Sequence, residues 1–295
     1  QYKGICNDII DKLSTKLNKS FQSFLMETLI LYMVIPGRIN FLQLGRYGES
    51  CEQRFRQNFS KDFDWLEFNL SLADKVLTGD RKAIAIDPSF ISKSGKHTPW
   101  ISYFWSGAAS MTQRGLEILG VGLIDIDTKD CIHLQSVQTP DSHTLESRNV
   151  NLLDWYLLVL KSMQDKLRGA SRYIVADAYF SKKSFALGLQ AMKFDLISRL
   201  RHDAALFYPT LEKPTGKRGR PKLYDGKIDI ANLDKSRVQK IAIDKGELYT
   251  LIAYSKSLKQ KVSLAIWYSK EERKPKLFFC TDINMSGKDV IEYYR

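Results

Sequence analysis

Two aspartates follow short apolar runs in a pattern that suits metal chemistry. Asp87 ends the run Lys82–Ile86 in RKAIAIDPSF, and Asp177 ends the run Tyr173–Ala176 in RYIVADAYF. A short apolar run that stops at a polar residue predicts a buried strand. Ligands and metals bind at strand ends of α/β sheets, because side chains there reach solvent while the backbone stays fixed. We therefore expect these two strands to deliver two carboxylates to one site.

Two carboxylates from different strands are suited to phosphoryl transfer with two divalent cations, which lie about 3.5–4 Å apart in such sites. One cation activates the attacking water or 3′-hydroxyl, and the other stabilises the leaving oxygen. Mg²⁺ (or Mn²⁺) is the expected cofactor, since it prefers oxygen ligands and keeps several waters. An aspartate at a strand end is also a common turn residue. We expect that simpler role for Asp125, Asp127 and Asp282.

The remaining residue patterns disfavour several other chemistries. The four histidines and four cysteines are scattered, without HExxH or CxxC spacing. A zinc hydrolase and a disulfide framework are therefore unsupported. The chain also has no GxxxxGK[ST] or GxSxG segment, so ATP use and serine hydrolysis have no support.

The composition favours a nucleic-acid partner. The 295 residues carry 45 Lys and Arg against 33 Asp and Glu, a net charge of +12 that is spread along the chain. Such an excess suggests a polyanionic partner, although solubility alone is the alternative. The longest apolar run, Phe24–Ile35, contains Glu27 and is too short for a bilayer, so no membrane association is expected. The separated cysteines fit a reducing cytoplasm.

Basic residues near the two aspartates are candidate DNA contacts. Lys93 and Lys96 follow Asp87, and Lys182 and Lys183 follow Asp177. These lysines would neutralise phosphates at the site, or they are solvated surface lysines.

Two other segments could contact DNA. Arg218 and Arg220 belong to the segment RGRP, the core of an AT-hook that lays arginines into a narrow minor groove. An exposed charged loop tip is the alternative. Trp267 could stack on an unpaired base, but a core aromatic is favoured for it.

Residues 1–80 are predicted to be helical and to form a DNA-binding region. The expected helices are Ile5–Leu17, Ser20–Ile35, Glu49–Asn58 and Phe63–Leu77. A short connection at Gly45–Gly48, flanked by basic residues, would suit a helix-turn-helix-like DNA contact. The flanking residues are Arg38, Arg46, Arg54 and Arg56. A plain helical bundle with a basic face is the alternative.

Residues 81–200 are predicted to be the larger part of an α/β core. The order is strand, strand, strand, helix, strand, helix, strand, with a loop after Asp87, a helix at Asn149–Arg168 and a helix at Ser181–Met192 capped by Ser181. Strands joined through helices give a parallel part, and consecutive strands give an antiparallel part. The order resembles the ribonuclease-H-like fold, a mixed sheet flanked by helices. Residues 201–275 are predicted to be a β-rich insertion, and 276–295 resume the core with a helix from Ser286.

The segments AIDPSFISKSGK, VADAYFSKKSF and LFFCTDINMSGKDVIEYYR together resemble the DDE transposases of bacterial insertion sequences, of the insertion sequence 4 type. The resemblance covers about residues 81–295. That family has a signature after its insertion: Tyr, two residues, Arg, three residues, Glu, six residues, Lys. Tyr294 stands at the signature tyrosine, so the third acid would lie beyond Arg295 and the chain is expected to be truncated. Glu292 is not expected to replace it, since it lies on another face of the helix from Tyr294.

The resemblance implies a function. Family members cut both DNA strands at inverted-repeat ends, join the 3′-hydroxyls to target DNA, need Mg²⁺ and act as dimers on paired ends. Asp87 and Asp177 carry over as catalytic metal ligands, and Tyr294 as a residue that holds DNA. The partners would be double-stranded DNA and a second copy of the chain, in the bacterial cytoplasm at the nucleoid.

Two alternatives to a transposase stay open. One is an inactive DNA-binding remnant, and the other is a nuclease of the same fold without strand transfer. Two acids without the third should hold metal poorly, so little or no activity is expected from residues 1–295 alone.

Overall fold

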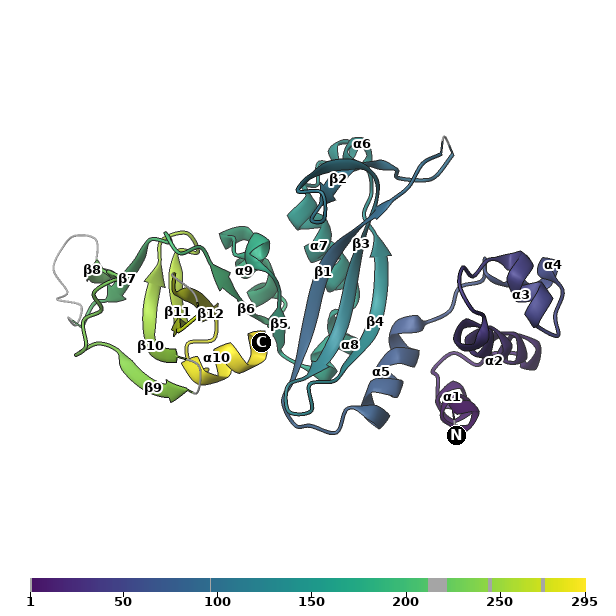
Figure 1. The fold of residues 1–295 in the computed structure, drawn as a ribbon, viewed down its shortest axis with the longest axis horizontal. Helices are drawn as coiled ribbons and strands as arrows, with labels where there is room; N and C mark the ends of the chain where they lie inside the picture. The colour runs from purple at the N-terminus through teal and green to yellow at the C-terminus, as the bar shows by residue number, and fades with distance from the viewer. Residues whose placement is uncertain (1, 96, 212–221, 244–245, 272–273) are drawn as a thin grey trace. The chain divides into compact units, whose positions relative to one another are not determined.

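The computed structural model describes residues 2–95, 97–211, 222–243, 246–271 and 274–295 (Figure 1). The chain divides into two compact units, Gln1–Thr78 and Gly79–Arg295. Within the described ranges, no helix has both the length and the hydropathy that a bilayer crossing requires.

The first unit contains five helices within its described residues. They are α1 (Tyr2–Ile10), α2 (Lys19–Val34), α3 (Phe41–Tyr47), α4 (Glu52–Asn58) and α5 (Trp65–Val76). Asparagine and aspartate caps start three of them, because each side-chain oxygen accepts a hydrogen bond from a backbone N–H of the first turn. These caps are Asn18, Asn40 and Asp64.

The predicted connection at Gly45–Gly48 is wrong, because residues up to Tyr47 form α3. The Asn40 cap starts this helix, and Gly45 lets it approach α4 closely. A Cβ at Gly45 would lie 2.7 Å from the backbone nitrogen of Glu52. The two short helices are therefore a close pair, and the turn between them lies at residues 48–51, later than the sequence suggested.

The second unit is built on one large mixed sheet. Its first strands are β1 (Lys82–Ser92), β2 (Ser102–Ser106), β3 (Met111–Asp125), β4 (Cys131–Gln138), β5 (Tyr173–Val175) and β6 (Asp195–Leu200). They lie in the order β4-β3-β1-β5-β6, and β2 pairs with the first residues of β3, from Met111 to Gly115. β1, β5 and β6 are parallel, whereas β3 and β4 are antiparallel additions.

The later strands extend the same sheet beyond β6. They are β7 (Leu206–Pro209), β8 (Tyr224–Lys227), β9 (Gln239–Ile243), β10 (Gly246–Ser255), β11 (Gln260–Ser269) and β12 (Lys276–Cys280). β12 pairs with β6, and the order continues through β11 and β10. The predicted β-rich segment therefore adds its strands to the sheet edge at β6.

Helices cover both faces of this sheet. They are α6 (Ser142–Ser147), α7 (Leu152–Ser162), α8 (Gln164–Ala170), α9 (Lys183–Ala191) and α10 (Gly287–Tyr294), with a 3₁₀ turn η1 at Ala178–Phe180. On one face, Tyr156 of α7 and Phe185 of α9 pack on Phe180, with ring centroids 5.5 and 4.8 Å away. On the other face, Val290 and Tyr293 of α10 belong to a core cluster with strand residues. Its cap is Ser286, as predicted.

Two local predictions about the second unit are wrong. The strand that contains Asp87 does not end there, because β1 continues to Ser92 and pairs with β3 throughout. Pro88 is tolerated in this strand, since β5 pairs with β1 only at Ile84 and Ala85, and none of the described strands faces the proline on that side. Ser181 is not a helix cap; its hydroxyl donates instead to the carbonyl oxygen of Arg199.

One prediction concerns the close approach of β1 and β3. A Cβ at Gly115 would lie 2.3 Å from the carbonyl oxygen of Ile91 and 2.5 Å from the Phe90 ring. We expect Gly115→Ala to lower the free energy of unfolding by about 1–3 kcal/mol, since backbone must shift to admit the methyl group. Chemical denaturation measures this change.

Gly226→Ala is the control, because a Cβ on this β8 residue meets nothing within 4 Å. Equal stability of the two variants would contradict the close packing of β1 on β3.

Candidate active site

Asp87 and Asp177 lie just beyond the short parallel pairing of β1 and β5, Asp87 inside β1 and Asp177 after the end of β5. β1 and β5 pair at Ile84 with Ile174 and at Ala85 with Val175, so two further residues along each strand lead to the two aspartates. Neighbouring strands are about 4.8 Å apart, which brings the two side chains close together. Both line one cavity of about 510 Å³. The structure therefore brings the two predicted carboxylates to one place.

Alternation along the strands defines the face on which the aspartates lie. Ala83 and Val175 contact the core cluster that α10 covers. Because every second residue of a strand points to the same side, Asp87 and Asp177 continue this face beyond the end of the covered part. The carboxylates thus lie on the sheet face that carries the C-terminal helix.

Tyr294 lies on the same side, at the end of α10. Its ring packs on Phe278 with centroids 5.0 Å apart. Burial raises the pKa of the Tyr294 hydroxyl; the positive charge of Arg199 opposes this shift, and the negative charge of Asp177 adds to it. The hydroxyl is therefore protonated at neutral pH and lies within electrostatic range of Asp177.

The surroundings of the two carboxylates differ. Asp177 is fixed as the cap of η1, where its side chain accepts a hydrogen bond from the Tyr179 backbone N–H at 3.0 Å. The Ser198 hydroxyl donates to the Asp177 carbonyl oxygen at 2.7 Å. Burial raises the pKa of Asp87, and the negative charge of Asp177 raises it further. The two groups repel each other, and a cation between them would remove that repulsion.

The donor set fits a hard divalent cation, because carboxylate oxygens are the ligands that Mg²⁺ and Mn²⁺ prefer. Across the described part of the chain, no three His, Cys, Asp or Glu side chains are close enough to hold a metal together. Asp87 and Asp177 are the acids that this site could offer to a cation. Water and substrate oxygens would then complete the coordination.

Glu117 is a third carboxylate in the cavity, but it lies on the opposite face of the sheet. It pairs with Phe90, three residues beyond Asp87, so alternation turns it away from the aspartates. The Tyr156 hydroxyl donates to it at 2.6 Å, and burial raises the pKa of that hydroxyl, as does the charge of Glu117. Glu117 was not singled out from the sequence, because only strand pairing reveals its place.

The other acids considered from the sequence have structural partners. Glu292 accepts a hydrogen bond from Arg81 at 2.5 Å, at the start of β1 and away from Asp87. Asp125, Asp127 and Asp282 each accept a hydrogen bond from a backbone N–H in or beside a turn. This geometry agrees with the turn role expected for the three aspartates.

The predicted basic contacts have different positions. The Lys182 ammonium lies 4.3 Å from the centre of the Tyr179 ring, which lines the cavity. Lys183 starts α9 and is exposed. Lys93 follows the end of β1, roughly 20 Å along the extended chain from Asp87, so the two are not neighbours. Lys96, Arg218 and Arg220 lie outside the described residues.

Trp267 has the core position that the sequence favoured, and two other aromatic residues line the cavity. Trp267 is a core residue, 5% exposed, with the Arg295 guanidinium 4.2 Å from its ring. Sequence reasoning missed Tyr103 and Trp105, which line the same cavity as Asp87. The signal was the alternation in SYFWS, where two aromatics share one face of a strand.

The arginines of the first unit are partly engaged within it. Arg56 forms an ion pair with Glu52 and lies over the Phe41 ring, and Arg54 donates to the carbonyl oxygen of Ser20. Arg38 and Arg46 are exposed. Of the four predicted arginines, Arg54 and Arg56 are thus held by contacts within the first unit.

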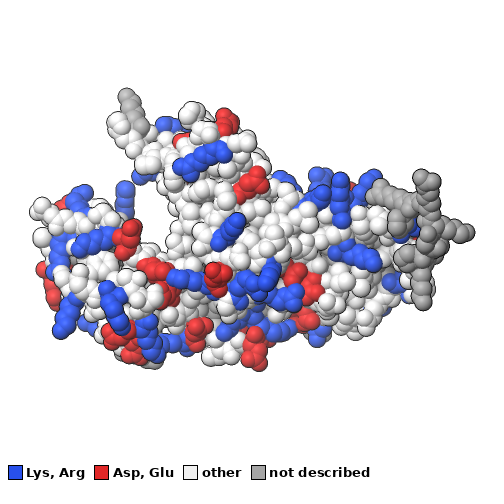
Figure 2. All heavy atoms as spheres, turned by 180° about the vertical axis from the view of Figure 1, so that it is seen from behind, with Lys and Arg blue, Asp and Glu red and all other residues white. Residues whose placement is uncertain are grey.

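On the face drawn in Figure 2, Lys and Arg are mixed with Asp and Glu rather than gathered in one stripe.

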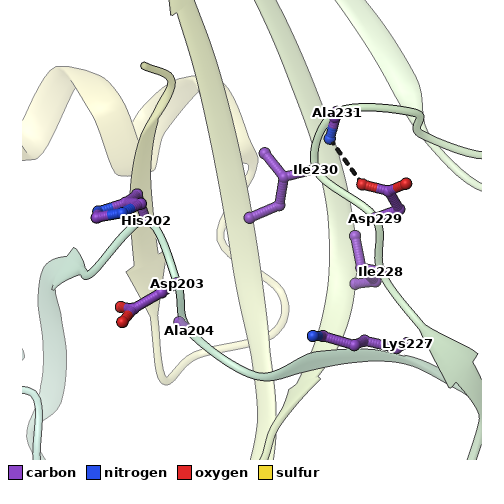
Figure 3. Close-up of a pocket in the computed structure, with 8 residues that line it drawn as sticks. All are labelled: His202, Asp203, Ala204, Lys227, Ile228, Asp229, Ile230 and Ala231. Carbon is purple, nitrogen blue, oxygen red and sulfur yellow. Dashed lines mark hydrogen bonds between the residues drawn. The ribbon is translucent and has the colours of Figure 1, made fainter.

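A second cavity, of about 420 Å³, lies between two loops near β7 and β8 (Figure 3). Its Asp229 carboxylate accepts a hydrogen bond from the nearby Ala231 N–H, and Ile230 points into the space (Figure 3). Asp203 also lines this cavity, and its carboxylate forms an ion pair with Arg201.

Comparison with known proteins identifies one family. Residues 33–251 match a family model described as DDE superfamily endonuclease. No curated protein gives a significant match. Among solved structures, endonuclease V of Ciona intestinalis, in complex with a DNA that contains an inosine, has 9% identity and a TM-score of 0.31, covering 82% of this chain and 88% of that chain. A similarity at that level carries no argument here.

One prediction concerns the repulsion between the carboxylates. We expect Asp87→Asn to raise the melting temperature in metal-free buffer at pH 7, because it removes a carboxylate whose pKa is raised by burial and by Asp177. The folded pKa of Asp87 lies above the ordinary value of 3.8, so the contribution of this carboxyl to stability is fully present below pH 3.8 and is lost as pH rises through the folded pKa. The advantage of the variant should therefore shrink on acidification.

Differential scanning fluorimetry across pH measures this effect. Asp130→Asn, at an exposed position in the β3–β4 turn, is the control and should change little. An unchanged or lower melting temperature for Asp87→Asn at pH 7 would contradict the repulsion.

Proposed function

The chain belongs to the DDE superfamily endonucleases, and on that premise we propose that it is a cut-and-paste DDE transposase of the insertion sequence 4 type. It would cleave DNA at insertion-sequence ends and join the 3′-hydroxyls to target DNA. The observation that carries the proposal is the pair Asp87 and Asp177, which line one cavity just beyond the parallel pairing of β1 and β5.

The strand order supports a ribonuclease-H-like core. Strands β4-β3-β1-β5-β6, with β1, β5 and β6 parallel, follow the order of that fold. In this proposal residues 81–200 and 276–295 form the core, and 201–275 are an insertion that widens the sheet. Residues 1–80 are a DNA-binding region, in which the exposed Arg38 and Arg46 are the available phosphate contacts.

Asp87 and Asp177 would hold Mg²⁺ or Mn²⁺. A bound divalent cation supplies charge neutralisation at the scissile phosphate and acidifies the attacking water or 3′-hydroxyl. The protein holds the two carboxylates on adjacent strands, where they repel each other. A bound cation would relieve this repulsion. The η1 cap interaction keeps the Asp177 carboxylate in place.

Two further side chains would position DNA. Lys182, held over the Tyr179 ring at the cavity, would contact a phosphate near the cleavage point. Tyr294 has a raised pKa and remains a hydrogen-bond donor at neutral pH, so its hydroxyl would donate to the DNA backbone. The proposed partners are double-stranded DNA and a second copy of the chain on paired ends, in the bacterial cytoplasm.

The metal role can be tested by Mn²⁺ binding, followed by the loss of the free-ion electron paramagnetic resonance signal. We expect Asp87→Asn and Asp177→Asn each to weaken Mn²⁺ binding by roughly tenfold, which corresponds to about 1.4 kcal/mol. Asp130→Asn should bind as the wild type does. Equal affinity in either site variant would remove that aspartate from the metal site.

Strand transfer is tested with labelled end DNA and Mg²⁺. The assay uses the full-length protein that contains these residues, because two acids alone should hold metal weakly. We expect the wild-type protein to give joined products, and Asp87→Asn or Asp177→Asn in it to abolish cleavage while DNA binding persists.

The products separate the proposal from its alternatives. Hydrolysed DNA without joined product would leave a nuclease. DNA binding without any cutting would leave a DNA-binding remnant.

A further inference from the structure

Two leucines stand exposed on the outer side of the helices that cover one face of the sheet. Leu158 of α7 is 48% exposed and Leu187 of α9 is 45% exposed. On their inner sides the same helices bury Tyr156 and Phe185 against Phe180. A surface helix normally carries polar residues on the side away from the core, so apolar residues on both sides indicate a contact surface.

A hollow of about 470 Å³ lies between α7 and α9, next to Leu158. Its lining is mostly apolar and includes Leu157, Gly188, Ala191 and Met192. Gly188 lets the two helices approach closely, because a Cβ there would lie 2.5 Å from Cδ1 of Leu157. A protruding leucine beside an apolar hollow is a shape that a second copy of the same surface can complement.

Charge on α7 is arranged to match a second copy of the same helix. Asp154 and Lys161 both line the hollow, on either side of Leu157 and Leu158. They lie two helical turns apart, about 10.5 Å along the axis, and on the same side of the helix. A two-fold axis between the two leucines would make α7 antiparallel to its copy and place Asp154 opposite Lys161 at both ends. A parallel arrangement would instead bring like charges together.

We propose that the outer side of α7 and α9 is a self-association surface, on which a second copy docks with its α7 antiparallel and its Leu158 in the hollow. The inference rests on the proposed function in taking a second copy as the partner, and it adds the surface that holds the two copies together. This surface lies on the sheet face opposite Asp87 and Asp177, because Tyr156 of α7 donates to Glu117 on that face. The two catalytic sites would therefore face away from each other, and association would need neither metal nor DNA.

The test measures the dimer dissociation constant of the full-length protein by sedimentation velocity, without metal or DNA. Asp154→Lys and Lys161→Asp each place like charges at both ends of the α7 pair, so each should weaken the dimer roughly hundredfold. An equimolar mixture of the two variants should recover wild-type affinity to within roughly tenfold, because each variant then supplies the charge opposite to that of the other.

The apolar contact is tested separately. Leu158→Ser should weaken the dimer roughly hundredfold, because a two-fold contact loses the leucine from both hollows. Asp130→Lys, at an exposed turn position, and Ile252→Ser, on β10 with 44% exposure, are the controls and should associate as the wild type does. Melting temperatures show that the variants are folded. Mn²⁺ binding by Leu158→Ser should be unchanged, because Asp87 and Asp177 lie on the other face.

Three results would overturn the inference. They are a protein that stays monomeric at every concentration, a dimer that persists in Leu158→Ser, and a mixture of the two charge variants that stays monomeric. Loss of the dimer in Ile252→Ser would also overturn it, since the contact would then lie on β10. A dimer that meets all these expectations but joins no DNA would leave the inference standing and overturn the proposed function alone.

Discussion

The short parallel pairing between β1 and β5 is the contact on which the site depends. It joins the two strands only at Ile84–Ile174 and Ala85–Val175, yet it sets the register that places the two aspartates beside each other. A slip by one residue would turn one carboxylate to the other face of the sheet. The fully buried side chains Ile84 and Ile174 oppose such a slip, because it would remove one of them from its present packing.

The C-terminal helix is fixed to the same part of the sheet from two directions. Arg81, directly before β1, forms ion pairs with Asp289 at 3.4 Å and Glu292 at 2.5 Å on α10. On its other side the helix packs Val290 and Tyr293 into the core cluster. These partly exposed ion pairs contribute little stability singly, but they orient the helix that carries Tyr294 toward Asp177.

Local sequence patterns predicted the two strands that carry the aspartates to one site, but not every element or element boundary. The two runs ending in Asp87 and Asp177 were recognisable because short apolar runs report burial, and Ser286 was recognisable as a helix cap. The continuation of β1 through Pro88, the backbone-bound Ser181 and the helix α3 were missed. In each case the deciding partner is distant in sequence or is a close contact that only Gly permits.

Long-range strand pairing also determines which aromatic residues line the cavity at the site. The cavity that joins Asp87 to Tyr103 and Trp105 depends on the β2–β3 and β1–β3 registers, which no local pattern reveals. Trp267 lies in the core, which is the position that the sequence favoured for it. The exposure of an aromatic ring depends on the position of its strand in the sheet, so composition alone could not identify Tyr103 and Trp105 as cavity residues.

The most direct test of the account is anomalous diffraction from crystals of the chain soaked in Mn²⁺. The account predicts one or two anomalous peaks in the cavity, within coordination distance of oxygens from both Asp87 and Asp177, and no peak there in Asp177→Asn crystals. Peaks that are absent from this cavity, or that persist unchanged in the variant, would contradict the claim that these two carboxylates form a metal site.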